Sequence, residues 1–229
     1  YYIILIFKKK CAKIRQKLKL QSFCADFLTK IQQYNDMEKN MSEFIIPKEK
    51  TVCFSGHRPE KLPDGGDISS PVMGVIRAML HQEIASAIDD GYTCFITGLA
   101  RGIDLMAGDL VLDFKRSDPR IQLVAAVPYR AQPKNLRSFE KFIYGCLINE
   151  AADIVYISEE YTKDCMQKRN KFMIDNSSRL IAAVSSYRSG TGQTIRLAEK
   201  AGIEIRTINI AKIASAADEA KSSPVKLMF

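Results

Sequence analysis

Three glycine-rich segments combine a permissive backbone with side chains that bind anions. They are Ser55-Gly-His-Arg-Pro59, Thr97-Gly-Leu-Ala-Arg-Gly-Ile-Asp104 and Ser189-Gly-Thr-Gly-Gln-Thr194. Glycine lets a backbone approach a ligand closely, arginine pairs with phosphate, and the free N–H groups of a helix N-terminus attract anions. Each segment alone is a weak signal. Together they predict a site for a phosphate-bearing ligand.

The first two segments each carry an arginine. Gly56 permits a tight turn before His57 and Arg58, and Arg58 suits a phosphate or pairs with a nearby acid, as many loop arginines do. In the second segment two glycines flank a helix start, which favours an anion at that helix end. The residues concerned are Gly98, Gly102, Arg101 as a clamp, and Asp104 as a ribose contact or a helix N-cap.

The third segment, which includes Gly190, leads into a helix expected from residue 194 and carries hydroxyls at Thr191 and Thr194. It lacks the Gly-Lys-Ser/Thr ending of a P-loop, which disfavours ATP hydrolysis of that type. Further candidates lie between the segments. Tyr129 stacks on a base or covers the edge of the core. Arg169 makes a second anion contact, with Asn170 beside it, or faces solvent on a helix.

Short apolar runs alternate with helical patterns along the chain. Strands are expected over 51–54, 93–96, 121–127, 154–157, 180–184 and 203–210, and helices over 71–90, 103–115, 136–150, 168–177 and 194–201. Near-continuous apolar strands alternating with helices predict an α/β fold. We expect a Rossmann-like, doubly wound, mainly parallel sheet of about six strands with helices on both faces. Ligands in such folds bind beyond the carboxyl ends of the strands.

The length and net charge of the chain limit its domain organisation and the partners to expect. The 229 residues suit one domain over 49–210, with a basic N-terminal extension over 1–48 and a C-terminal tail over 211–229 that is a short helix or irregular. The net charge is +8, but residues 1–40 hold nine Lys/Arg and three acids, so the remaining 189 residues carry only +2. A broad DNA-binding face is therefore not indicated.

Cysteine usage and hydropathy give the expected compartment. None of the six cysteines forms a C-x-x-C pair and only two histidines exist, so we expect no metal site. Cys53 and Cys94 lie in apolar runs, which favours small buried side chains in a reducing, cytoplasmic setting. The apolar run at residues 1–7 is far shorter than the ~20 residues of a membrane span and lacks the order of a signal peptide.

Met41 is the expected natural start of the chain. The preceding Met37-Glu-Lys-Asn40 is compatible with the codons ATGGAGAAAAAT, whose GGAG resembles a bacterial ribosome-binding site. We therefore hypothesise that residues 1–40 are upstream sequence read in frame. The alternative is a basic helix over residues 8–20 that contacts a membrane surface or RNA.

Four segments together resemble the SLOG superfamily, and its YpsA-like branch in particular. They are Cys53-Phe-Ser-Gly-His-Arg-Pro-Glu-Lys-Leu62, Thr97-Gly-Leu-Ala-Arg-Gly-Ile-Asp104, Cys165-Met-Gln-Lys-Arg-Asn-Lys-Phe-Met-Ile-Asp175 and Gly190-Thr-Gly-Gln-Thr194. The resemblance covers about 51–210. It implies a Rossmann-like domain that senses or processes a nucleotide-derived ligand.

Two other branches imply different activities. The LOG phosphoribohydrolases use an arginine, matched by Arg169, and a glutamate whose position falls on Thr194. Because threonine lacks the charge that glycosidic cleavage needs, the resemblance puts that reaction in doubt unless Asp104, Asp175 or Glu199 substitutes. The DprA-like proteins resemble the Gly-x-Ala-Arg-Gly-Ile-Asp segment and bind single-stranded DNA, which needs a basic groove with stacking aromatics.

The leading expectation is therefore a binding module for sensing or regulation. Phosphate or pyrophosphate contacts are expected from Gly56, Arg58, Gly98, Arg101, Gly102, Gly190 and Thr191, and ribose or base contacts from Asp104, Arg169 and Asn170. The expected ligand is a nucleotide or an ADP-ribose-like compound, with no other cofactor required. The resemblance allows a homodimer, although the sequence displays no interface for one. A nucleotide hydrolase and a single-stranded DNA-binding protein are the alternatives.

Overall fold

The computed structural model describes residues 44–222 of the chain. The strands are β1 (Thr51–Gly56), β2 (Cys94–Thr97), β3 (Gln122–Val127), β4 (Asp153–Tyr156), β5 (Arg179–Val184) and β6 (Glu204–Asn209). The α-helices are α2 (Pro71–Asp89), α3 (Ile103–Ser117), α4 (Ser138–Glu150), α5 (Cys165–Asp175), α6 (Gly190–Ala201) and α7 (Ile210–Ser222). Short 3-10 segments are η1 (Lys48–Lys50), η2 (Pro59–Lys61), η3 (Pro63–Gly66) and η4 (Gln132–Asn135). The proposed start at Met41 lies outside the described residues.

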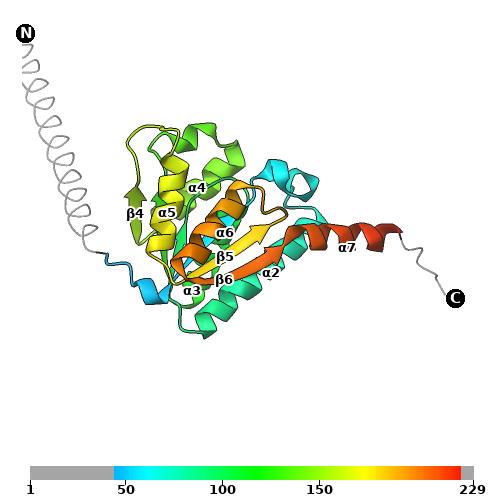
Figure 1. Cartoon of the computed structure of the whole chain (residues 1–229), viewed down its shortest axis with the longest axis horizontal. Helices are drawn as coiled ribbons and strands as arrows, with labels where there is room; N and C mark the ends of the chain where they lie inside the picture. Colours follow the sequence, from blue (N-terminus) through cyan, green and yellow to red (C-terminus); the bar gives the residue numbers. More distant parts are fainter. Residues whose placement is uncertain (1–43, 223–229) are drawn as a thin grey trace, which may run out of the picture. The chain divides into compact units, whose positions relative to one another are not determined.

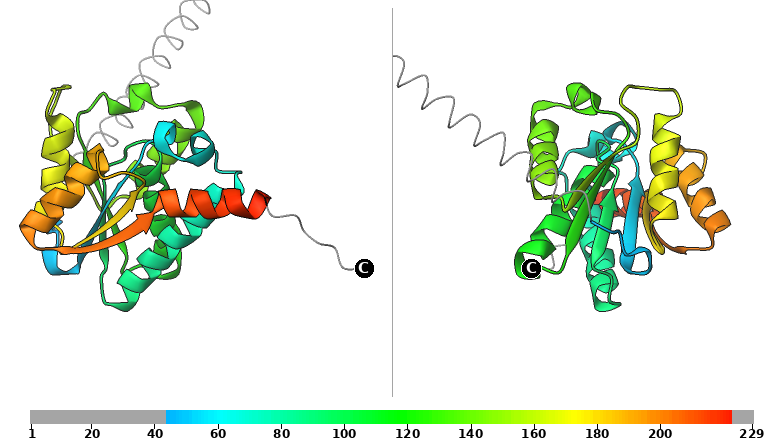
Figure 2. Two further views of the ribbon diagram at one scale, coloured as in Figure 1. Left: turned by 45° about the vertical axis from the view of Figure 1, so that its right-hand side comes forward. Right: turned by 90° about the vertical axis from the view of Figure 1, so that its left-hand side faces the viewer.

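The strands form one parallel sheet in the order β4-β3-β2-β1-β5-β6. Helices α2, α3 and α4 cover one face, and α5 and α6 cover the other, which confirms the predicted doubly wound arrangement (Figures 1 and 2). Helix α7 packs beside α2 at the end of β6. The chain runs from β1 toward β4 on one side of the sheet and then crosses to β5 on the other side of β1. The switch point therefore lies between β1 and β5.

The central strands are buried on both faces, as their apolar runs predict. Side chains of β1, β3 and β5 are almost wholly inaccessible, and Phe54 stacks on Phe95 with ring centroids 6.1 Å apart. Cys53 and Cys94 are buried within this core, which confirms their expected role, and burial raises the pKa of Cys53 to about 12. The thiol of Cys53 is therefore protonated near neutral pH.

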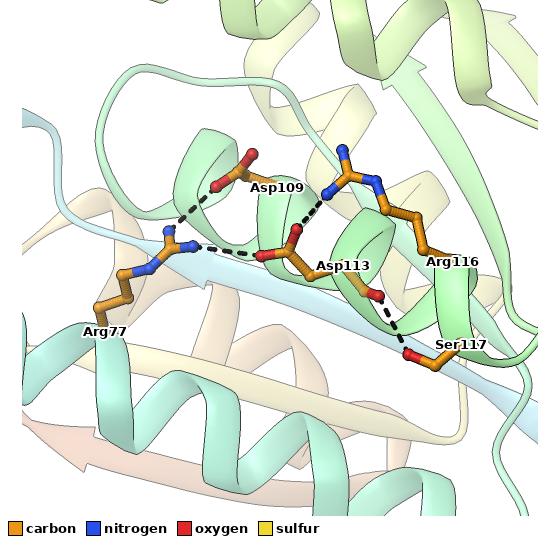
Figure 3. Close-up of polar contacts among 5 residues, drawn as sticks. All are labelled: Arg77, Asp109, Asp113, Arg116 and Ser117. Carbon is orange, nitrogen blue, oxygen red and sulfur yellow. Dashed lines mark hydrogen bonds and ion pairs between the residues drawn. The ribbon is translucent and has the colours of Figure 1, made fainter.

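Local signals place the helix ends. Ser70 caps α2, because its hydroxyl accepts a hydrogen bond from the N–H of Met73, and Pro71 takes the first helical position. Gly91, with φ of +91°, follows the end of that helix. Ion pairs also join α2 to α3, because Arg77 of α2 lies between Asp109 and Asp113 of α3, as Figure 3 shows.

Two helices begin earlier than predicted. Helix α5 starts at Cys165 and α6 starts at Gly190, so the expected starts at residues 168 and 194 were wrong. Ser189 caps α6 by accepting the N–H of Gly192, which places the whole Gly-Thr-Gly run inside the first helical turn. Glycine in a helix is unfavourable by itself, so the run looks like a loop until this cap is known.

Gly56 provides a test of the close packing between β1 and α3. A Cβ added there would lie 2.3 Å from the Cβ of Ile103, whereas one added to Gly74 of α2 would meet no heavy atom within 4 Å. We expect Gly56→Ala to lower the free energy of unfolding by about 1–3 kcal/mol through overpacking. Gly74→Ala should raise it by about 0.5–1 kcal/mol, because alanine suits a helix interior better. Urea denaturation measures both, and an unchanged Gly56→Ala protein would contradict the packing.

Candidate functional site

The loops that follow β1, β2 and β5 meet at the carboxyl edge of the sheet, around the switch point between β1 and β5. Two side-chain contacts tie them together. His57, after β1, reaches the loop after β5, and Arg169 of α5 reaches the loop after β2 and the start of α3. The glycine-rich segments identified in the sequence are thus neighbours in space.

His57 is buried and joins two of these loops. Its Nε2 accepts a hydrogen bond from the N–H of Ser185 at 2.9 Å, and its Nδ1 lies 3.4 Å from the hydroxyl oxygen of Thr191. Because Nε2 accepts, Nδ1 must carry the proton of the neutral ring, and Thr191 then accepts from it. Burial, and to a lesser degree the charge of Lys61, lowers the pKa of His57. The contact therefore requires the uncharged imidazole.

Arg169 and Asp104 form a buried ion pair above the strand ends. The guanidinium NH1 lies 3.1 Å from the carboxylate, and the two side chains are 7% and 5% exposed. The Nε of Arg169 is buried without a hydrogen-bond partner among the described residues. Burial raises the pKa of Asp104, and the guanidinium beside it opposes that rise. The pair thus contains a buried cation with an unused donor.

Glycine at position 98 is a requirement of this arrangement. A Cβ there would lie 1.3 Å from NH1 of Arg169, so the guanidinium occupies the space of the missing side chain. The hydroxyl of Thr97 donates to the backbone oxygen of Asp104 at 2.8 Å and accepts the N–H of Leu99, whose φ is +53°. This hydrogen bond holds the first turn of α3 against the end of β2.

Gly102 allows a second close approach, between the loop after β2 and the loop after β1. Its φ is +87°, and an added Cβ would lie 2.5 Å from the backbone oxygen of His57. Alanine at this position would therefore combine backbone strain with a clash against main chain.

The start of α6 supplies hydroxyls and open backbone. Asn170 of α5 donates through Nδ2 to the hydroxyl of Thr194 at 2.8 Å, and that hydroxyl donates to the backbone oxygen of Gly190. Gly190 is exposed, and a Cβ there would meet nothing within 4 Å. Gly192 was not predicted as a site residue. An added Cβ there would lie 2.0 Å from the backbone oxygen of Tyr187, so the second glycine of Gly-Thr-Gly was the signal for this contact.

The three remaining predicted residues lie in different surroundings. Arg101 donates through Nε to both carboxylate oxygens of Glu140 and through NH1 to Glu60. Those partners hold Nε and NH1 within the chain, whereas NH2 is buried without a hydrogen-bond partner among the described residues. Arg58 is exposed, and no described side chain forms a hydrogen bond or ion pair with it.

Tyr129 is 7% exposed, and its ring packs edge to face with that of Tyr161, the centroids 5.4 Å apart. Its ring covers the edge of the core beyond β3, whereas Tyr161 is 64% exposed. Sequence reasoning did not single out Tyr161, and its position five residues past the short edge strand β4 gave no signal for a ring contact.

The parallel sheet, its strand order and the glycine-rich loops at its carboxyl edge define a Rossmann-like α/β domain. Residues 52–213 match the model of the family described as the YspA SLOG family, whose model is named YpsA. The match spans well over half of the chain, and the chain therefore belongs to this family, which confirms the resemblance found in the sequence.

Relatives of known sequence agree with this assignment. The chain is similar to the uncharacterized SPbeta prophage-derived protein YoqJ of Bacillus subtilis (strain 168), with 32% identity over 118 residues, which cover 46% of this chain and 69% of YoqJ. It is also similar to a UPF0398 protein of Bacillus cereus (strain G9842), with 22% identity over 148 residues, which cover 64% of this chain and 80% of that protein.

Two solved structures are similar to the chain at low identity. DNA processing protein A from Streptococcus pneumoniae aligns with a TM-score of 0.47 and 15% identity, over 76% of this chain and 57% of that protein, little more than half its length. DNA processing protein A from Helicobacter pylori aligns with a TM-score of 0.47 and 16% identity, over 77% of this chain and 75% of that protein.

Within residues 44–222, none of the helices combines the length and the apolar character that a membrane span requires. The same residues bring together no group of three or more His, Cys, Asp or Glu side chains that could hold a metal ion.

The buried contact of His57 generates a pH prediction. Because the folded state disfavours the charged ring, the unfolded chain binds a proton more readily, so stability falls as the pH drops below the ordinary His value of 6.5. The NMR titration should give His57 a pKa below 6.5. The chain contains one other histidine, and a His81→Gln variant assigns the two signals. A His57 pKa at or above 6.5 would exclude the neutral buried ring.

Gly98 and Gly190 form a matched pair for testing the position of Arg169. In Gly98→Ala the new methyl group takes the place of the guanidinium, so we expect the ion pair with Asp104 to break and stability to fall by about 1–3 kcal/mol. Gly190→Ala adds a methyl group to open space and should change stability by no more than about 0.5 kcal/mol. Equal unfolding midpoints in urea for the two variants would contradict this placement.

Proposed function

We propose that this protein binds a phosphate-bearing nucleotide or nucleotide-derived ligand at the carboxyl edge of β1, β2 and β5, as a sensing or regulatory domain. The observation that carries the proposal is the buried guanidinium of Arg169. It lies against Gly98 in the loop after β2 and beside Asp104 of α3, and it retains an unpartnered Nε. A buried cation with an unused donor lowers the stability of the fold. Its presence therefore points to a function, such as binding an anionic or polar ligand.

The start of α6 is the best place for the phosphate. The helix dipole and the N–H groups of its first turn favour an anion there, and Gly190 leaves the approach open. The hydroxyl of Thr191 accepts from His57, which leaves its own proton free to donate to a phosphate oxygen. Arg58, exposed and without an ion pair among the described residues, supplies a further cation after β1.

The ribose or base then extends toward α5. Asn170 keeps its amide oxygen as an acceptor after donating to Thr194, and Asp104 and Arg169 close that end of the site. Because Arg101 is engaged by Glu140 and Glu60, we assign it to the support of the loop rather than to the ligand.

A second candidate function is hydrolysis of an N-glycosidic or phosphoester bond of the same ligand. One observation favours it: the carboxyl group of Asp104 is buried in the site with a raised pKa, as a general acid would be. Against it, Thr194 occupies the place of the glutamate used by LOG enzymes, and its hydroxyl is already engaged by Asn170 and Gly190. Binding without turnover is therefore the leading proposal.

The proposal predicts thermal stabilisation by a nucleotide, dinucleotide or ADP-ribose derivative. A ligand at 100 times its dissociation constant adds about 2.7 kcal/mol of stability. Full-length chain is screened by thermal shift, and each mixture is analysed by mass spectrometry. An intact ligand supports a sensor, and a cleaved ligand supports the hydrolase. Stabilisation only by a single-stranded oligonucleotide, with steep salt dependence, would instead indicate a nucleic-acid site.

Arg58→Ala tests whether the binding site is the one proposed. The substitution should raise the dissociation constant of the stabilising ligand by roughly tenfold or more, because a charge-assisted hydrogen bond contributes about 1.5–3 kcal/mol. Arg120→Ala is the matched control, since Arg120 is exposed and precedes β3 at the opposite edge of the sheet. Equal ligand affinity in the two variants would contradict the proposed position of the ligand site, even if a nucleotide binds elsewhere on the protein.

A further inference from the structure

The carboxyl ends of β3 and β4 carry aromatic side chains that the proposed function does not use. Tyr156 ends β4, Tyr129 follows β3, and Tyr161 lies between β4 and α5. The ring of Tyr161 is 64% exposed and packs edge to face with the buried ring of Tyr129. The guanidinium of Arg130 lies 4.1 Å from the centroid of the Tyr156 ring and pairs with Glu159. This part of the sheet edge therefore presents an open aromatic surface.

A buried acceptor, the Oε1 atom of Gln132, lies close to these rings. The Gln132 side chain is 6% exposed, and its Nε2 donates to the backbone oxygen of Leu99 at 3.0 Å. Because a carbonyl oxygen can only accept, this bond fixes which end of the amide is the oxygen. The backbone N–H of Gln132 donates to the backbone oxygen of Tyr129, which ties the amide to the aromatic cluster.

The unpartnered polar atoms of the site gather around one loop. Among the described residues, four buried side-chain polar atoms lack a hydrogen-bond partner, and three of them border the loop after β2. They are NH2 of Arg101 in the loop, Nε of Arg169, whose guanidinium lies against Gly98, and Oε1 of Gln132, which is bonded to Leu99. Such atoms lower stability until a partner completes them, so their clustering indicates where a polar ligand binds. The partner of Oε1 must be an N–H or O–H donor.

We propose that the carboxyl ends of β3 and β4 form the base-recognition end of the ligand site, where an adenine-type base stacks on Tyr161 and donates its exocyclic amine to Oε1 of Gln132. This inference rests on the proposed function, because it extends the phosphate site at the start of α6 along the same edge. Aromatic rings stack on bases. Adenine presents an amine donor where guanine presents an acceptor oxygen, which would face Oε1 without a bond.

The separation of the two ends favours a ligand with a pyrophosphate. Helix α6 follows β5, and three strand spacings separate β5 from β3 in the sheet. At about 4.8 Å per spacing, the ends of these two strands lie about 14 Å apart. Arg169 and Asn170 belong to α5, which packs against both β3 and α6 and therefore lies between the two ends. A nucleoside diphosphate derivative has one phosphate more than a monophosphate with which to cover this span.

A movement of Tyr161 gives the base access to Gln132. Oε1 is inaccessible to solvent in the described arrangement, so a neighbouring side chain must shift when the ligand binds. Tyr161 is suited to this, because most of its ring is in water and the ring packs on Tyr129, which is itself bonded to Gln132. Exposed side chains change rotamer within nanoseconds.

Adenosine, which has no phosphate, tests the base end independently of the phosphate end. Its binding to the full-length chain is measured by ligand-observed NMR. We expect Tyr161→Ala to raise the dissociation constant roughly fivefold or more, because the stacking face is lost. Phe142→Ala is the matched control, since Phe142 is an exposed aromatic residue of α4 (67%), and it should leave adenosine binding unchanged.

Inosine carries an oxygen in place of the amine of adenosine and has the same ribose. It therefore distinguishes an amine donor from a ribose hydroxyl. We expect the original chain to bind adenosine about tenfold or more tightly than inosine, because inosine leaves the buried acceptor unpaired. Gln132→Leu should abolish this preference, whereas a purely structural role of Gln132 would weaken both nucleosides equally and preserve it. Circular dichroism melts confirm that each variant remains folded.

Three results would overturn the proposal: equal adenosine affinity in Tyr161→Ala and Phe142→Ala, equal affinity of the original chain for adenosine and inosine, or an unchanged preference in Gln132→Leu. If one of these occurs while ADP-ribose still stabilises the chain, the base end alone is wrong. If neither adenosine nor any nucleotide binds, the proposed function is contradicted as well.

Discussion

The buried ion pair between Arg169 and Asp104 joins the two helical layers across the carboxyl ends of the strands. Arg169 comes from α5 on one face of the sheet and Asp104 from α3 on the other. Its geometry imposes glycine at position 98 and fixes the turn after β2 through Thr97. Removing one partner of such a pair typically costs about 3–5 kcal/mol, because the other charge stays buried. The shape of the site depends on this contact.

The hydrogen bonds around Thr194 also bear on whether the site could catalyse hydrolysis. Two hydrogen bonds in series join the amide of Asn170 to the hydroxyl of Thr194 and that hydroxyl to the backbone oxygen of Gly190. Groups that satisfy one another in this way hold a rigid shape, and rigidity lowers the entropic cost of ordering a bound ligand. The arrangement suits recognition, whereas hydrolysis would require Asp104 to act while it remains paired with Arg169.

The sequence was sufficient for the sheet but not for the pairing of side chains. Apolar runs located the strands within a residue or two, because a strand buried on both faces must be apolar throughout. The glycine-rich loops were also found, and topology brings them together. However, Arg101 is held by a glutamate 39 residues away, and Arg169 by an aspartate 65 residues away. No local spacing encodes such partners. The start of α6 was missed because it is set by a hydrogen bond that the hydroxyl of Ser189 accepts, and the helix propensities of the residues do not indicate it.

The connection from β1 to α2 begins with His57 at the strand ends and passes through η2 and η3 before Ser70 caps α2. Gly102 presses against it from the side, close to the backbone oxygen of His57. The backbone oxygen of His57 also accepts the N–H of Ile103, so the beginning of the segment moves with the start of α3. In thermodynamic terms, if a ligand at the strand ends stabilises one arrangement of this segment, that arrangement raises the affinity for the ligand by the same factor.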